Sequence, residues 1–133
     1  MKDDNYVSYE TAKLLQEKGF DGYCDHFYYE GVIAPANMCK NHWFRKGNEA
    51  APLLQQAFRW LREIHNIFIV VEPATWSVVD NKPGSYTFHY WHGDNYAKPE
   101  NIDIFGQSWK TYEKAADFAI RYCLKKEIQD ERH

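Results

Sequence analysis

Two short segments of the sequence combine cysteine and histidine, the residue types that bind zinc. They are Cys24-x-His26 and Cys39-x-x-His42. Two ligands from one short segment can converge on a single ion, so the two pairs together could supply a tetrahedral set of sulfur and nitrogen ligands. The one-residue spacing of the first pair differs from that of a zinc knuckle, and Cys24 equally suits a small buried hydrophobic residue. Zinc is therefore kept as an alternative, and no other cofactor is expected.

Other signatures of catalysis are weak. The sequence has no Gly-x-Ser-x-Gly elbow, and its glycines are scattered rather than gathered into a phosphate-binding loop. Cys39 and His42 lack an orienting third group, and His92 with Asp94 is more typical of local hydrogen bonding than of a site. The sequence favours a binding protein over an enzyme and identifies no catalytic residue.

A run of aromatic and basic residues forms the main candidate binding site. Trp43, Phe44 and Arg45 are consecutive, and Arg59 and Arg62 follow on a predicted helix. Aromatic rings can stack on bases while arginines neutralise phosphates, and the same side chains suit contact with another protein. We take protein contact as the main hypothesis and binding of single-stranded nucleic acid as the alternative.

Charge and hydropathy limit the class of partner. The 133-residue chain carries a formal net charge of −3, which does not provide the basic field that phosphate binding usually needs. The longest apolar run, Ile67 to Val71, is far shorter than the about 20 residues of a membrane-spanning helix. The polar, acidic start is unlike an export signal, so we expect a cytoplasmic protein with free thiols and no membrane partner.

Caps, turns and periodicity predict the elements that position these residues. Ser8 is a good N-cap, and Asn66 and Thr111 mark the end of one helix and the start of another. The predicted helices span about 9–18, 52–66 and from 111 onward. The predicted strands span about 23–29, 67–71, 76–80 and 86–91. Long loops are expected at 31–50 and 93–107.

These elements predict a single α+β domain over residues 1–133. We expect about four strands in a mainly antiparallel sheet, with three helices on one face and the order α-β-α-β-β-β-α. The ends, about 1–6 and 129–133, are expected to fray. The strand at 67–71 is apolar on both faces, which predicts a central strand.

Aromatic residues make up 17% of the chain, so rings are expected to form much of the core and some are expected at the surface. In the strand at 86–91, Phe88 and Tyr90 share one face and His89 and Trp91 share the other. Either both faces are covered, or one of them is a contact surface.

Three segments resemble a group of small proteins from gut Bacteroides-type bacteria and their phages or mobile elements. They are Val7-Ser8-Tyr9-Glu10-Thr11-Ala12-Lys13-Leu14-Leu15 through Asp21, Ala51-Pro52 through Ile67, and Thr111-Tyr112-Glu113-Lys114-Ala115. The group has no established activity. The resemblance therefore implies an accessory protein of a phage or mobile element, and it implies no catalytic residues.

Overall fold

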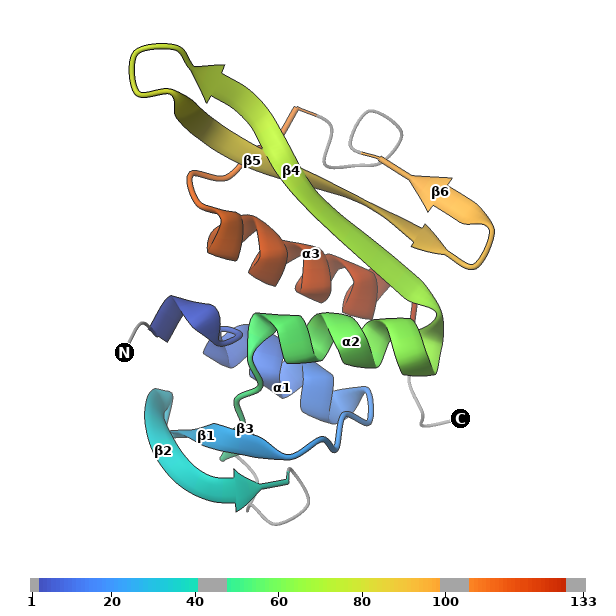
Figure 1. Cartoon of the computed structure of the whole chain (residues 1–133). Coiled ribbons are helices and arrows are strands. Elements are labelled where there is room, and N and C mark those ends of the chain that lie inside the picture. Colours follow the sequence, from blue (N-terminus) through green and yellow to red (C-terminus); the bar gives the residue numbers. More distant parts are fainter. Residues whose placement is uncertain (1–2, 41–47, 99–105, 129–133) are drawn as a thin grey trace.

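The structure is a computed structural model that describes residues 3–40, 48–98 and 106–128. Its described elements form three layers, with helices between two antiparallel sheets (Figure 1). In chain order they are η1 (Asp3–Asn5), α1 (Tyr9–Glu17), β1 (Cys24–Tyr29), β2 (Val32–Cys39), β3 (Glu49–Ala50), α2 (Leu54–His65), β4 (Ile67–Ser77), β5 (Lys82–His92), β6 (Asn95–Ala97) and α3 (Tyr112–Lys126).

The first sheet has the strand order β2-β1-β3. The side chains of β1 alternate, with Cys24, His26 and Tyr28 buried on the face toward the helices. Pro35 of β2 pairs with His26 of β1. Strand β2 is an edge strand, and an edge tolerates the missing N–H of a proline. The register shifts between Cys24 and His26, where β2 carries extra residues.

The second sheet has the order β4-β5-β6 and is dominated by the long β4–β5 hairpin. Its inner face packs on α3. Phe88 is fully buried and its ring contacts those of Trp109, Phe118 and Tyr122. Rings therefore carry much of this half of the core, as the composition predicts.

Each helix of the middle layer buries an apolar stripe. In α2 the buried residues are Leu54, Ala57, Phe58 and Leu61, at helical spacing. Small residues of α3, including Ala116 and Ala119, are fully buried and allow close approach of its neighbours. No helix of the described residues is long and apolar enough to cross a membrane.

The α+β class and the three predicted helices are confirmed. The strand prediction is wrong in number and grouping. The described residues form six strands in two sheets, with the helices between the sheets rather than on one face of a single sheet. The expected loop at 31–50 contains β2 and β3, and that at 93–107 contains β6. Strand β2 contains Pro35 and Asn37, and β3 and β6 are only two and three residues long, so none of the three shows the periodicity on which the prediction depended.

The expectations for β4 and for the N-terminus also need correction. The predicted strands 67–71 and 76–80 lie largely in one strand, because β4 continues through Pro73 to Ser77. Its pairing register with β5 is irregular between Pro73 and Trp76. It is an edge strand, not a central one. Near the N-terminus, η1 is ordered and Tyr6 is only 8% exposed, forming a β-bridge with Leu53, so fraying does not extend to residue 6.

Candidate interaction surface

The sequence-predicted binding residues are not brought into one described site. Trp43, Phe44 and Arg45 lie outside the described residues. Arg59 and Arg62 lie on the exposed side of α2. The guanidinium of Arg59 pairs with Glu63 one turn away, with 3.0 Å between Nε and Oε2, so its charge is partly neutralised.

The zinc hypothesis gains no support from the described part of the chain. There, no group of three or more His, Cys, Asp and Glu side chains is arranged to hold a metal ion. His26 Nδ1 lies 3.0 Å from the Asp25 carboxylate, and its ring packs on Tyr6 with centroids 4.5 Å apart. Cys39 Sγ donates to the Cys24 carbonyl at 3.3 Å, and His42 lies outside the described residues.

The outer face of the second sheet carries aromatic residues in register. Phe68 of β4 pairs with Trp91 of β5, which pairs in turn with Tyr96 of β6. Directly paired residues of antiparallel strands project from the same face, so these three rings form a row across the sheet. Val70 pairs with His89 and begins the next row.

These side chains are exposed although they are apolar. The exposed fractions are 44% for Phe68, 39% for Val70, 37% for Trp91 and 45% for Tyr96, against 0% for Ile67 and Phe88 and 3% for Tyr90 on the inner face. We call these four exposed residues the outer aromatic face. One face of the β4–β5 hairpin therefore packs into the core, and the other is exposed to solvent.

Contacts among the side chains hold the rings of this face in place. The centroids of Trp91 and Tyr96 are 4.7 Å apart. The His89 ring meets both edge-on, at 5.1 and 5.4 Å. His89 Nδ1 lies 3.1 Å from a carboxylate oxygen of Glu72, which fixes the imidazole against the rings. The result is a preorganised aromatic cluster with a carboxylate at its border.

A polar hollow of about 620 Å³ adjoins the outer aromatic face. Tyr96 lines both the hollow and the face, and Glu72, Thr87 and Lys98 also line the hollow. The Thr87 hydroxyl is buried and has no hydrogen-bond partner among the described residues. An apolar face bordered by a polar hollow has the layout of a protein interface, with an apolar centre and a polar rim.

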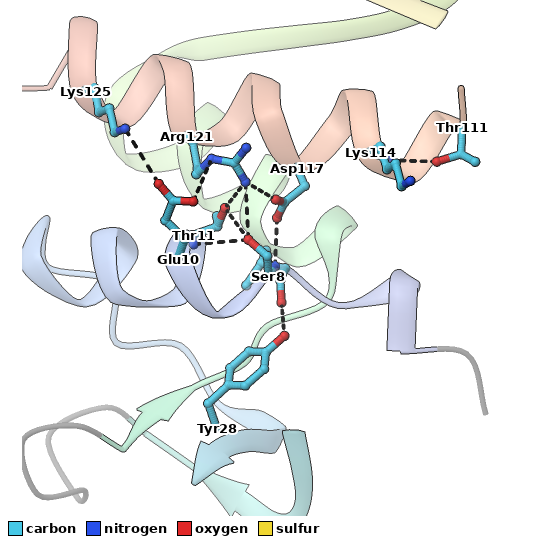
Figure 2. A network of polar contacts seen from close by, with 10 residues as sticks. Ser8, Glu10, Thr11, Tyr28, Thr111, Lys114, Asp117, Arg121 and Lys125 are labelled. Carbon is cyan, nitrogen blue, oxygen red and sulfur yellow. Dashed lines mark hydrogen bonds and ion pairs between the residues drawn. The ribbon is translucent and has the colours of Figure 1, made fainter. Parts of the chain in front are cut away.

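A second cavity, of about 420 Å³, lies where α1, α3 and Tyr28 meet. Several of its polar groups bind one another (Figure 2). The Ser8 N–H donates to Asp117 at 2.8 Å, and Arg121 pairs with Asp117 and donates to the hydroxyls of Ser8 and Thr11. The Tyr28 hydroxyl donates to the Val7 carbonyl at 2.7 Å. We interpret this network as the junction that holds α1 to α3.

Sequence reasoning anticipated the outer aromatic face only in part. The alternation in β5 indicated that His89 and Trp91 share a face that is either covered or a contact surface. Phe68 and Val70 lie in the segment for which the sequence predicts a central strand, and Tyr96 lies in an expected loop. The missing signal is the pairing register, which depends on turn geometry and on the neighbouring strand.

The comparisons give no relatives from which to transfer a role. Neither the known family models nor the curated proteins nor the solved structures give a match to this chain. The site is therefore interpreted from its own geometry.

Proposed function

We propose that this protein is a non-enzymatic binding module that contacts another protein through the outer aromatic face. The proposal rests on one observation, the row formed by Phe68, Trp91 and Tyr96 across three strands with more than a third of each side chain exposed. Contiguous apolar side chains on the surface of a folded domain mark interaction sites. Trp and Tyr are also enriched among the residues that dominate binding energy at protein interfaces.

Charge favours a protein over a nucleic acid as the partner. The Glu72 carboxylate lies beside the rings, and the adjoining hollow is lined by both Glu72 and Lys98 rather than by basic residues alone. The whole chain is also negative, at −3. A phosphate backbone would meet no single-sign basic field here, whereas an apolar protein surface needs none.

The proposed role is that of an accessory protein in a phage or mobile element, the setting implied by the resemblance of the helical segments. The partner is then to be sought among the proteins made together with it. An accessory factor acts by contact, and the outer aromatic face supplies the surface for that contact.

The experiment compares partner capture by surface variants. Tagged protein is cross-linked in the cells that produce it, and the cross-linked partners are identified by mass spectrometry. Phe68→Thr and Trp91→Thr remove the exposed rings and place a β-branched residue, which favours a strand, at each position. We expect each variant to lose at least about tenfold in partner recovery, since aromatic residues central to an interface contribute about 2 kcal/mol or more.

The matched control is Tyr29→Thr, which removes a 53% exposed ring from β1 in the other sheet. Its partner recovery should equal that of the wild type. Unchanged recovery in both Phe68→Thr and Trp91→Thr, with circular dichroism showing folded protein, would refute the proposal. Titration with a short single-stranded oligonucleotide tests the competing ligand, because binding that weakens steeply with salt and is lost in Trp91→Thr would assign the face to nucleic acid.

A further inference from the structure

The thiols of Cys24 and Cys39 face each other across the first sheet. Cys24 in β1 and Cys39 at the end of β2 are direct partners in the antiparallel register. Both side chains point into the core, with exposed fractions of 2% and 6%. Cys39 Sγ already contacts the Cys24 carbonyl at 3.3 Å. The two thiols therefore lie on the same side of the same strand pair.

This placement is close to the geometry of a disulfide. Paired residues on one face of antiparallel strands have Cβ atoms about 4.5–5.5 Å apart, and a disulfide needs about 3.5–4.5 Å. The register shift next to Cys24 and the positive φ of 45° at Met38 show that β2 is irregular just before Cys39. An irregular strand can make the remaining approach more easily than a regular ladder can.

We propose that Cys24 and Cys39 are a redox-modification site that forms a cross-strand disulfide when the protein meets a disulfide oxidant such as oxidised glutathione. The Cys39 thiolate attacks oxidised glutathione, forming a mixed disulfide and releasing one glutathione thiolate. The Cys24 thiolate then attacks the Cys39 sulfur and releases the second glutathione. Two protein thiols are oxidised, one glutathione disulfide is reduced, and the two thiol protons end on the two glutathione molecules.

Burial sets the speed and the order of these steps. Burial, followed by the neighbouring Cys39 thiol, raises the pKa of Cys24 to about 12. Burial also raises the pKa of Cys39. Thiolates are scarce in the closed protein, so oxidation proceeds through local opening at the end of β2, where the slightly more exposed Cys39 reacts first. The same burial slows the reduction of the finished disulfide.

The third cysteine provides an internal reference. Cys123 lies in α3, is fully buried, and belongs to the middle layer rather than to either sheet. It faces no cysteine across a strand pair. Selective oxidation of Cys24 and Cys39 with Cys123 left as a thiol is therefore the specific signature of the proposed site.

Mass spectrometry reads this signature directly. Reduced protein is incubated with oxidised glutathione at mildly alkaline pH, unfolded, alkylated and digested with trypsin. The sequence has no Lys or Arg between Lys18 and Lys40, so both cysteines fall in the peptide 19–40. We expect this peptide to be unalkylated and about 2 Da lighter than its reduced form, while the Cys123 peptide is fully alkylated.

Variants and a melting experiment provide the controls. Cys123→Ala should form the same disulfide, and Cys24→Ala should stop at a mixed disulfide between Cys39 and glutathione. Oxidised wild-type protein should have a Tm about 5–10 °C above that of the reduced protein, because the link restricts the conformations of the unfolded chain. Dithiothreitol should reverse the shift.

Three results would overturn the proposal. The first is a 19–40 peptide that keeps two alkylatable thiols or carries glutathione on both cysteines. The second is a link to Cys123, and the third is a disulfide that lowers Tm, which would mean that the native strands do not accommodate it. The wild-type measurement decides the matter even if Cys24→Ala fails to fold.

Discussion

At the scale of single residues, two ion pairs of the same type occupy different environments. Arg59 and Glu63 in α2 are separated by one helical turn and have side chains 70% and 58% exposed. Asp117 and Arg121 in α3 have the same spacing but are 14% and 21% exposed. Asp117 also accepts the Ser8 N–H beside the first turn of α1, where the helix dipole favours a negative charge.

We expect disruption of the partly buried pair to cost far more stability than disruption of the exposed one. Asp117→Ala should lower the free energy of unfolding by about 1–3 kcal/mol, because it leaves the Ser8 N–H without its acceptor and removes the carboxylate that pairs with Arg121. Arg59→Ala should lower it by less than about 0.5 kcal/mol. Urea denaturation measures both. Equal effects of the two substitutions would contradict the inference that Asp117 stabilises the α1–α3 junction.

The residue scale also shows the limit of sequence reasoning about the site. The prediction that Trp91 shares a face with His89, opposite Phe88 and Tyr90, is confirmed, because alternation along one strand requires only the local sequence. Its neighbours Phe68 and Tyr96 come from other strands, and only the register brings the three together. A row across a sheet is a long-range property, and a single sequence carries little information about it.

At the scale of elements, the helix ends were predictable because their chemistry is local. Ser8 accepts from the Thr11 N–H and Thr111 from the Lys114 N–H, as N-caps do. Asn66 ends α2 in the left-handed conformation, with φ 57° and ψ 38°. Strands β2, β3 and β6 were missed, because pairing partners rather than their own residues make them strands.

Asn66 provides a test of the α2–β4 connection. Its backbone conformation is one that glycine adopts freely and that β-branched residues resist. Asn66→Gly should leave the free energy of unfolding within about 0.5 kcal/mol of the wild type, whereas Asn66→Val should lower it by about 1–2 kcal/mol. Thermal denaturation of the wild type and the two variants measures these differences in the free energy of unfolding. A Val variant as stable as the Gly variant would show that the backbone strain is absent.

The link between α3 and β5 depends on Glu127. The Tyr90 hydroxyl donates to this carboxylate at 2.8 Å, and His92 Nδ1 lies 2.7 Å from its other oxygen. Burial raises the pKa of Glu127, but the hydrogen bonds from His92 and Tyr90 together lower it by more, so the net pKa lies below the ordinary 4.5. The folded state therefore favours the charged carboxylate.

This depressed pKa predicts how the link depends on pH. The contribution of Glu127 to stability is complete above pH 4.5 and is lost as the pH falls through the lower folded-state pKa. Glu127→Gln should reduce the free energy of unfolding by about 1 kcal/mol at neutral pH, and the difference from the wild type should shrink in acid. The exposed Glu63→Gln is the control. A pH-independent difference for Glu127→Gln would contradict the role of its charge.

At the scale of the whole molecule, the helices of the middle layer join two sheets that share no strand pairing among the described residues. One core cluster includes Tyr28 of β1, Leu61 of α2, Phe88 of β5 and Leu124 of α3. The class of the fold followed from the mixture of elements in the sequence. The division into two sheets did not, because both sheets use antiparallel neighbours and only packing decides which strands meet.

A shared core predicts that both sheets unfold together. In native-state hydrogen exchange, the most protected amides of β1, β5 and α3 should converge on one free energy of opening, with one dependence on denaturant. Leu124→Ala, at a fully buried position in α3, should lower that common value by about 2–4 kcal/mol in both sheets. Val79→Ala, at a position 95% exposed, should lower it in neither. A different result would contradict the shared core. If the amides of β4 and β5 kept their protection in Leu124→Ala while those of β1 lost it, the two sheets would be separate cooperative units, and α3 would stabilise only one of them.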